Sequence, residues 1–324
     1  MRHNRRTFLK FAGAAAFTPA MPAILRAQAW PSQTIKAIVP FTAGSTLDVI
    51  GRIVLNALAP RLGQTIVVEN RGGAGGTIGS AAVARSAPDG YTLLINASAH
   101  SAAPAAYPKI TYDPAGDFAA VAMFGSVPNV TIVNPEKGFK TLADLVAEGR
   151  KRELVFSSAG VGSATHWAAE RLKIASGIKA RHLPFRGGPE ATNEVAAGRV
   201  DFACMGTSSS MGLINAGKLH PLAVSTPQRS SSLPNVPTTI EAGFANSDYT
   251  FWNGMFAPAK TPRAIIERLH KETMEVLALP DVRKQLLPQA IESLPLKPQE
   301  FDALVRKEIE INKALVKAAG LKFG

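Results

Sequence analysis

The residues with the clearest chemical potential lie in three loops rich in glycine and hydroxyl groups. They are Phe41–Thr46, Ser157–Thr165 and Arg186–Pro189, and each follows a predicted strand and opens a predicted helix. The first N–H groups of a helix have no partner inside it, and with the helix dipole they attract anions. Ordinary helix capping explains any one loop alone. Three such loops at the carboxyl ends of strands predict a cleft for a small anion.

Catalytic motifs find no support in the sequence. It has no G-x-S-x-G elbow, no H-E-x-x-H and no G-x-x-x-x-G-K-[ST]. Ser163 and His166 form the only local nucleophile–base pair, and three residues of separation at a helix start give no triad. The six histidines are dispersed without metal-ligand spacing. We therefore expect no catalytic residue and no metal.

A run of glycines from Gly72 to Gly79 raises the question of a dinucleotide site. The fingerprint that starts at Gly73 fails at Ile78, and no acidic residue follows at the expected distance of about 20 residues. We interpret these glycines as a tight turn with close helix packing, and we expect no cofactor.

The elements that must position the three loops alternate between strand-like and helical patterns, which predicts α/β layers built on parallel sheets. The predicted strands are 35–41, 66–69, 91–95, 130–133, 154–156, 181–185, 200–205 and 222–225. Predicted helices begin at the Thr141 capping box, at Pro189, at Pro262 and at Pro298.

Apolar stretches near 121–133 and 249–257 are the predicted crossings between two domains, with Trp252, Met255 and Phe256 in the seam. The expected organisation is a signal at 1–29, a first domain of 30–130 completed by 248–324, and a second domain of 131–247.

Composition and charge agree with an exported globular protein. The 324 residues are 46% hydrophobic with a formal net charge of +12, and the basic residues do not cluster, so we expect no nucleic-acid partner. Asn4–Lys10 matches a twin-arginine signal, and Ala27–Ala29 a cleavage site before Trp30. Removing 1–29 lowers the net charge to +7. The single cysteine, Cys204, is expected to be buried and inert.

Strings throughout the predicted mature chain resemble one family. They include Val68-Glu69-Asn70-Arg71, Ala87-Pro88-Asp89-Gly90-Tyr91 and Leu233-Pro234-Asn235-Val236-Pro237-Thr238. The chain is similar to the extracytoplasmic receptors of tripartite tricarboxylate transporters, first known as the Bordetella uptake gene products. The resemblance implies a type II periplasmic binding protein fold, in which two Rossmann-like α/β domains joined by crossover strands close on a small carboxylate.

The resemblance also implies a set of ligand-binding residues, with the carboxylate gripped by backbone amides and hydroxyl groups. In the first domain they are Ala43, Gly44, Ser45, Thr46, Ser98 and His100. In the second domain they are Ser158, Gly162, Ser163, Thr165, His166, Arg186, Gly187 and Met205, with Arg186 at most accessory. Met205 stands where the family often has an acidic residue, which makes an amino-acid ligand less favoured.

The function implied is that of a monomeric periplasmic receptor that delivers a small organic carboxylate to membrane permease subunits. Two alternatives stay open: a secreted enzyme on the same fold, and a ligand-sensing module for a membrane kinase. A turnover assay would distinguish the enzyme from the receptor. The neighbouring genes would distinguish the sensing module from the receptor.

Overall fold

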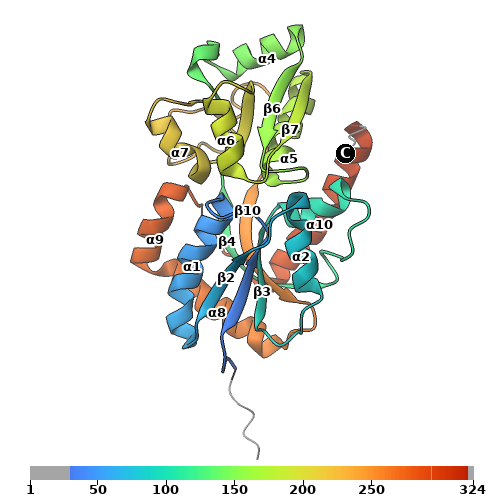
Figure 1. Cartoon of the computed structure of the whole chain (residues 1–324), viewed down its shortest axis with the longest axis vertical. Helices are drawn as coiled ribbons and strands as arrows, with labels where there is room; N and C mark the ends of the chain where they lie inside the picture. The colour runs from blue at the N-terminus through green and yellow to red at the C-terminus, as the bar shows by residue number, and fades with distance from the viewer. Residues whose placement is uncertain (1–29, 293, 320–324) are drawn as a thin grey trace, which may run out of the picture. The chain divides into compact units, whose positions relative to one another are not determined.

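Two five-stranded sheets organise the chain (Figure 1). The computed structural model describes residues 30–292 and 294–319. The predicted export signal at 1–29 lies outside these residues. From Pro31 onward the chain forms one compact unit.

The first sheet, with the helices that pack on it, is called lobe 1. Its strand order is β2-β1-β3-β10-β4. The strands are β1 Ile35–Val39, β2 Ile66–Asn70, β3 Thr92–Ala97, β4 Phe118–Val127 and β10 Phe251–Pro258. The helices are α1 Thr46–Leu62, α2 Thr77–Ala84, α3 Ala99–Ala106, α8 Arg263–Ala278, α9 Pro280–Leu286 and α10 Pro298–Ala319, with single 3-10 turns at η1 Ala74–Gly76 and η3 Leu287–Gln289.

The second sheet and its helices form lobe 2. Its strand order is β7-β6-β8-β5-β9. The strands are β5 Asn129–Val133, β6 Leu154–Ser158, β7 Ala180–Pro184, β8 Phe202–Gly206 and β9 His220–Val224. The helices are α4 Leu142–Lys151, α5 Ala164–Ser176, α6 Gly188–Ala196 and α7 Thr207–Asn215, with a 3-10 turn at η2 Pro135–Lys137.

The predicted α/β fold is confirmed, and each sheet combines the expected parallel strands with antiparallel ones. Strand β10 runs antiparallel to β3 and β4, and β5 runs antiparallel to β8 and β9. The remaining neighbours, linked by helical crossovers, are parallel. The antiparallel strands lie where the chain changes sheets, at Pro128 and between Val224 and Phe251. The two predicted crossings are therefore strands, and the exact domain boundaries stay a prediction.

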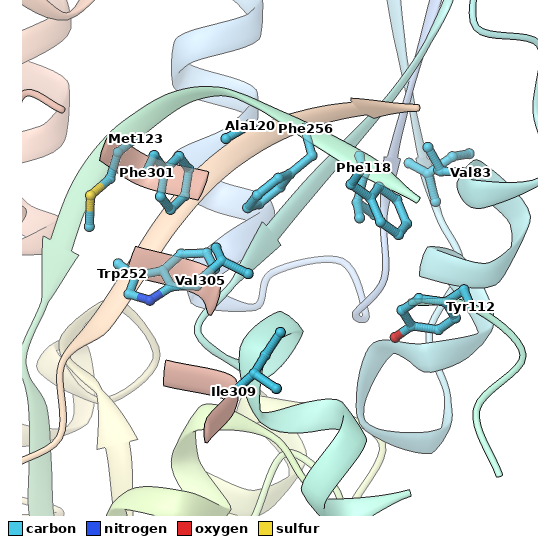
Figure 2. Close-up of a cluster of buried hydrophobic side chains, with 12 residues drawn as sticks. Val83, Tyr112, Phe118, Ala120, Met123, Trp252, Phe256, Phe301, Val305 and Ile309 are labelled. Carbon is cyan, nitrogen blue, oxygen red and sulfur yellow. The ribbon is translucent and has the colours of Figure 1, made fainter. Parts of the chain in front are cut away.

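The core of lobe 1 contains residues that the sequence analysis assigned to an interdomain seam. Trp252 and Phe256 are fully buried and pack with Phe301 of α10 at ring-centroid distances of 5.0 Å (Figure 2). Every residue of β10 is buried, so both faces of this strand are covered and its large side chains lie in the core.

Local signals at helix ends are confirmed where they rest on specific hydrogen bonds. Thr141 and Asp144 form the predicted capping box at α4.

In the glycine run, a Cβ on Gly79 would lie 2.8 Å from the Cβ of Pro40, so α2 needs glycine to pack this closely on the end of β1. Across the described ranges, no helix combines the length and apolar character that a bilayer crossing needs.

Candidate functional site

Helices from both lobes direct their first turns at one small cavity. Helices α1, α5 and α6 begin at Thr46, Ala164 and Gly188, after the three loops singled out in the sequence. The cavity has a volume of about 30 Å³, which is room for one or two water molecules. It is lined by Phe41, Ser45, Thr46, Leu47, Ala97, Ala99, Ser163, Ala164, Thr165, Gly188, Met205, Ser209 and Phe251.

The loop before α1 is held by a reciprocal cap. The Ser45 hydroxyl accepts from the Asp48 N–H at 3.4 Å, and Asp48 Oδ2 accepts from the Gly44 N–H at 2.9 Å. Asp48 Oδ1 also accepts from Arg52 Nε and from Asn70 Nδ2. Burial alone would raise the pKa of the Asp48 carboxyl, but these hydrogen bonds and the Arg52 charge lower it. Asp48 is thus an ionised carboxylate whose hydrogen bonds stabilise the loop.

The loop before α5 repeats this arrangement with different chemistry. The Ser163 hydroxyl accepts from the His166 N–H at 3.3 Å, and His166 Nδ1 accepts from the Gly162 N–H at 3.0 Å. An accepting Nδ1 is unprotonated, so this hydrogen bond assigns the ring proton of neutral His166 to Nε2. That nitrogen lies 3.7 Å from Glu170 Oε1. Burial lowers the pKa of His166, which keeps the ring neutral.

Beneath this loop, His166 stacks on a second imidazole. The His166 and His182 ring centroids are 3.7 Å apart, and His182 Nε2 lies 2.6 Å from the Ser158 hydroxyl. Burial lowers the pKa of His182 to about 3, and the nearby charge of Lys173 adds to this shift. A base this weak has little driving force for removing a hydroxyl proton near pH 7. The Ser158–His182 pair therefore stabilises the loop better than it activates a nucleophile.

The loop before α6 brings lobe 2 against lobe 1. Gly187 has an extended backbone, with φ −172° and ψ 172°. A Cβ there would overlap Oγ1 of Thr42 in lobe 1, and Thr42 Cβ would be only 3.1 Å away. Arg186, by contrast, is exposed and is not a lining residue.

Other contacts join the lobes around the cavity. The Ser208 hydroxyl of lobe 2 donates to Oγ1 of Thr46, and the Tyr107 hydroxyl of lobe 1 donates to the Val161 carbonyl at 2.7 Å. The Thr207 hydroxyl of lobe 2 donates to the Gln289 carbonyl at 2.9 Å. The two lobes thus contact one another on several sides of the cavity.

Some of the predicted ligand-binding residues line the cavity and others do not. The lining includes Ser45, Thr46, Ser163, Thr165 and Met205. Predicted residues outside the lining are Ala43, Gly44, Ser98, His100, Ser158, Gly162, His166, Arg186 and Gly187. Gly44, Gly162, Ser158 and His166 belong to the hydrogen-bond networks that hold the loops.

His100 lies in an aromatic cluster of lobe 1. Its ring centroid is 4.8 Å from that of Phe118 and 4.7 Å from that of Phe256. Its Nε2 lies 3.2 Å from the Pro114 carbonyl, and burial lowers its pKa to about 4. His100 is therefore a neutral core residue in this structure.

Several lining residues, three of them within the loops already singled out, were not predicted to bind the ligand. They are Phe41, Leu47, Ala97, Ala99, Ala164, Gly188, Ser209 and Phe251. Ser209 carries a signal that was available: Thr207-Ser208-Ser209-Ser210 follows strand β8 and opens α7, like the three loops. The apolar residues outside the loops carry no such signal, because their sequence pattern is that of ordinary core residues.

Reactive groups are scarce around the cavity. No charged side chain appears in the lining as far as residues 30–292 and 294–319 define it. Within those residues, no three His, Cys, Asp or Glu side chains are placed to hold a metal ion. Cys204 is buried, as predicted, and burial raises the pKa of its thiol to about 12. The arrangement offers amide and hydroxyl donors next to apolar side chains.

Comparison with known proteins agrees with this geometry. Residues 50–321 match the model of the tripartite tricarboxylate transporter family receptor. The chain is 31% identical to Protein BugT of Bordetella pertussis over 327 residues, which cover 99% of each chain.

Solved structures give the same result. The chain is similar to the periplasmic binding protein BugD, with 31% identity, a TM-score of 0.86, and coverage of 90% of this chain and 99% of that one. A Rhodopseudomonas palustris protein with adipate has the same identity, TM-score and coverage. MatC of that organism, with bound malate, has 30% identity, a TM-score of 0.82, and coverage of 89% and 100%. The chain therefore belongs to the tripartite tricarboxylate transporter receptor family, and it has the two-domain fold of periplasmic binding proteins.

Proposed function

We propose that this protein is a periplasmic receptor that captures a small organic carboxylate between its two lobes and delivers it to the permease subunits of a tripartite tricarboxylate transporter. The observation that carries the proposal is the meeting of three helix N-termini, from both lobes, at one small, partly open cavity. The adipate and malate bound by two solved relatives support the ligand class.

The grip on the carboxylate comes from neutral donors. In α1 the Ser45 hydroxyl occupies the Asp48 N–H, which leaves the first-turn amides of Thr46 and Leu47 for a ligand. In α5 the Ser163 hydroxyl occupies the His166 N–H in the same way. Amides at helix N-termini favour an anion without any positively charged side chain.

Capture proceeds by closure of the lobes. The cavity between the lobes has a volume of about 30 Å³, which is room for one or two water molecules, so we expect a ligand of the size of adipate or malate to enter and leave when the lobes move apart. A ligand that touches both lobes favours the closed arrangement by its difference in affinity for the two states.

Gly187→Ala tests closure without straining the backbone. Its extended φ suits alanine, but the new Cβ would press on Thr42 across the lobes. We expect at least a ten-fold loss of affinity for a carboxylate that the natural protein binds, a weaker compaction in small-angle scattering, and an unchanged melting temperature without ligand. Gly212→Ala is the control, because a Cβ there meets nothing within 4 Å. Equal affinity in both variants would refute closure on the ligand.

The proposed role is transport and not catalysis. The hydroxyl–imidazole pair of Ser158 and His182 stabilises the loop and has a weak base. Turnover of a bound carboxylate, followed by mass spectrometry, would contradict this part of the proposal.

Export and assembly complete the proposal. We expect cleavage after Ala29, export of the folded monomer through a twin-arginine signal, and domains of 30–130 with 248–324 and of 131–247. Intact mass of periplasmic protein tests the cleavage site. Loss of export on replacing Arg5 and Arg6 by lysine tests the signal, and sedimentation tests the monomer.

A further inference from the structure

A second and larger cavity lies open on the surface of lobe 1. It has a volume of about 400 Å³ and is formed by the first turns of α2 and by the segment 106–112; it is called the α2 groove. Most of its lining is apolar and includes Ile78, Ala81 and Ile110. Ile78 is 56% exposed. A groove with apolar side chains exposed in this way is typical of a surface that another molecule covers.

One wall of the α2 groove is held in place by lobe 2. Tyr107 lines the groove, and its hydroxyl donates to the Val161 carbonyl, in the loop before α5, at 2.7 Å. A Cβ on Gly162 of that loop would lie 2.9 Å from Cβ of Ala106 and from Cε2 of Tyr107. A Cβ on Gly75, in the turn that leads into α2, would overlap the Val161 carbonyl. Lobe 2 therefore packs directly against the residues that form this wall.

The same loop connects the α2 groove to the cavity between the lobes. Ser163 and Thr165, which follow Val161 and Gly162 in the loop, line that cavity. If the lobes moved apart, the hydrogen bond from Tyr107 to Val161 would break and the wall would lose its support. The shape of the groove thus depends on the same closure that a ligand in the cavity would favour.

The rim of the α2 groove is positively charged. Arg85 and Lys109 are exposed, and neither forms an ion pair with any residue that the structure describes. Arg85 Nη2 donates to Oγ1 of Thr111, which keeps the guanidinium beside the groove. The neighbouring carboxylates of Asp113 and Asp117 accept hydrogen bonds from backbone N–H groups of their own turn. A carboxylate from a partner can therefore pair with the rim while an apolar side chain enters the groove.

From this geometry we propose that the α2 groove is a docking surface for an acidic protein segment with a protruding apolar side chain, and that it accepts this segment when the lobes are closed. The inference rests on the proposed function and deepens it, because the partner is an extracytoplasmic segment of the membrane protein that receives the ligand. A partner that binds the closed form more tightly selects loaded receptor over empty receptor. An anionic membrane is a poorer match, since lipid-binding surfaces typically carry clusters of about four to eight basic residues.

Photocrosslinking in cells that produce the receptor together with its transporter tests the surface. p-Benzoylphenylalanine replaces Ile78 in the full chain, and mass spectrometry identifies the cross-linked peptides. The control position is Ile240, which is 41% exposed and follows the last strand of lobe 2. We expect position 78 to cross-link to an acidic extracytoplasmic segment of a membrane protein with about ten-fold higher yield than position 240. Equal yields, cross-links to phospholipid alone, or no cross-link at position 78 would overturn the inference.

Tyr107→Phe tests the dependence on closure. It keeps the ring in the groove wall and removes the hydroxyl that donates to Val161. We expect the cross-link yield at position 78 to fall about three-fold or more. Tyr112→Phe is the control, because it removes the other tyrosine hydroxyl of the groove from a residue in the lobe 1 core. Equal yields in the two variants would overturn the link between the groove and closure.

Uptake distinguishes docking from ligand binding. We expect Ile78→Asp to lower the uptake of radiolabelled malate or adipate about ten-fold, with an affinity by calorimetric titration within about two-fold of that of the natural protein. Ile240→Asp is the matched control and should change neither quantity. Normal uptake in Ile78→Asp, or a loss of affinity as large as the loss of uptake, would overturn the docking surface and leave a carboxylate receptor intact. A natural protein that binds no carboxylate would instead refute the proposed function, and cross-linking at position 78 would still test the surface.

Discussion

The loops before α1 and α5 share a backbone conformation although they belong to different lobes. Gly44 and Gly162 have φ values of 77° and 71°, in the left-handed region that favours glycine. The capping residues that follow, Ser45 and Ser163, have φ and ψ of −67° and 156° in one loop and −69° and 160° in the other. In each loop a side chain three residues after the serine accepts a hydrogen bond from the glycine N–H.

The accepting group is what differs. In lobe 1 it is the Asp48 carboxylate, and in lobe 2 it is the neutral His166 imidazole. A carboxylate accepts at any pH above its own pKa, whereas Nδ1 of the imidazole accepts only while it is unprotonated. The comparison shows that glycine and serine set the shape of such a loop, and that the accepting side chain sets the pH range over which the shape holds.

Asp48→Ala should break the lobe 1 loop and give the largest effect. It removes the acceptor of the Gly44 N–H and two further hydrogen bonds, from Arg52 and Asn70. We expect the free energy of unfolding to fall by about 3 kcal/mol, measured by urea denaturation.

Asp48→Asn is the matched control, because its amide oxygen can still accept from Gly44. It should lose less than half as much stability as the alanine variant. Equal losses would assign the effect to charge pairing with Arg52 and not to the loop.

Acid should weaken lobe 2 before it affects the lobe 1 loop. His182 has a pKa of about 3 when folded, so between pH 6.5 and 3 the unfolded chain binds a proton that the folded chain does not, and stability falls as the pH falls. At pH 5 this amounts to about 2 kcal/mol. Asp48 has a lowered pKa, and its contribution is lost only below about pH 4.

The measurement is urea denaturation at pH 7 and pH 5 for the natural protein and for His182→Asn. His100 has the same sign of shift and remains in both, so the difference isolates His182. Hydrogen exchange at the Gly162 amide, corrected for intrinsic rate, should speed up as the pH falls and His166 Nδ1 takes up a proton, while exchange at Gly44 should not change above about pH 4. If the free energy of unfolding depended on pH in the same way in both proteins, His182 would not be the cause of the loss of stability in acid.

Replacing either capping serine by alanine should cause the smallest losses of stability and affinity, and the two losses should differ. The Ser163 hydroxyl has two partners, the His166 N–H and Oγ1 of Thr165, whereas the Ser45 hydroxyl has one long bond to Asp48. We expect Ser163→Ala to cost about 1 kcal/mol of stability and to weaken carboxylate binding about ten-fold, with Ser45→Ala costing less.

Arg186→Ala is the contrasting variant, because this exposed side chain is outside the cavity lining. It should change affinity less than three-fold by calorimetric titration. If Arg186→Ala abolished binding and both serine variants bound normally, the carboxylate would be bound mainly by the Arg186 side chain and not by amides and hydroxyl groups.

Features that depend on neighbouring residues were predictable from the sequence. The Thr141 capping box, the helix starts after Pro262 and Pro298, and the three loops all follow from spacing within a few residues. The serines that cap α1 and α5 belong to this group, and so do the lining hydroxyls.

Features that depend on strand order were not predictable. Spacing does not reveal that β10 lies between β3 and β4, so Trp252 was assigned to a seam and not to a core. For the same reason, His100 could not be distinguished from a ligand-binding histidine, because the aromatic residues around it, Phe118 and Phe256, are distant in sequence. The apolar wall of the cavity also comes from residues that only the folded chain brings together.

The central place of β10 in lobe 1 has a consequence for synthesis. As the chain leaves the ribosome, every strand of lobe 2 is complete by Val224, whereas the neighbours β3 and β4 wait for a partner that starts at Phe251. Until then their facing edges are unpaired and open to wrong pairing. All strands of lobe 2 are thus available earlier in translation, whereas the lobe 1 sheet can be completed only after β10 has been made.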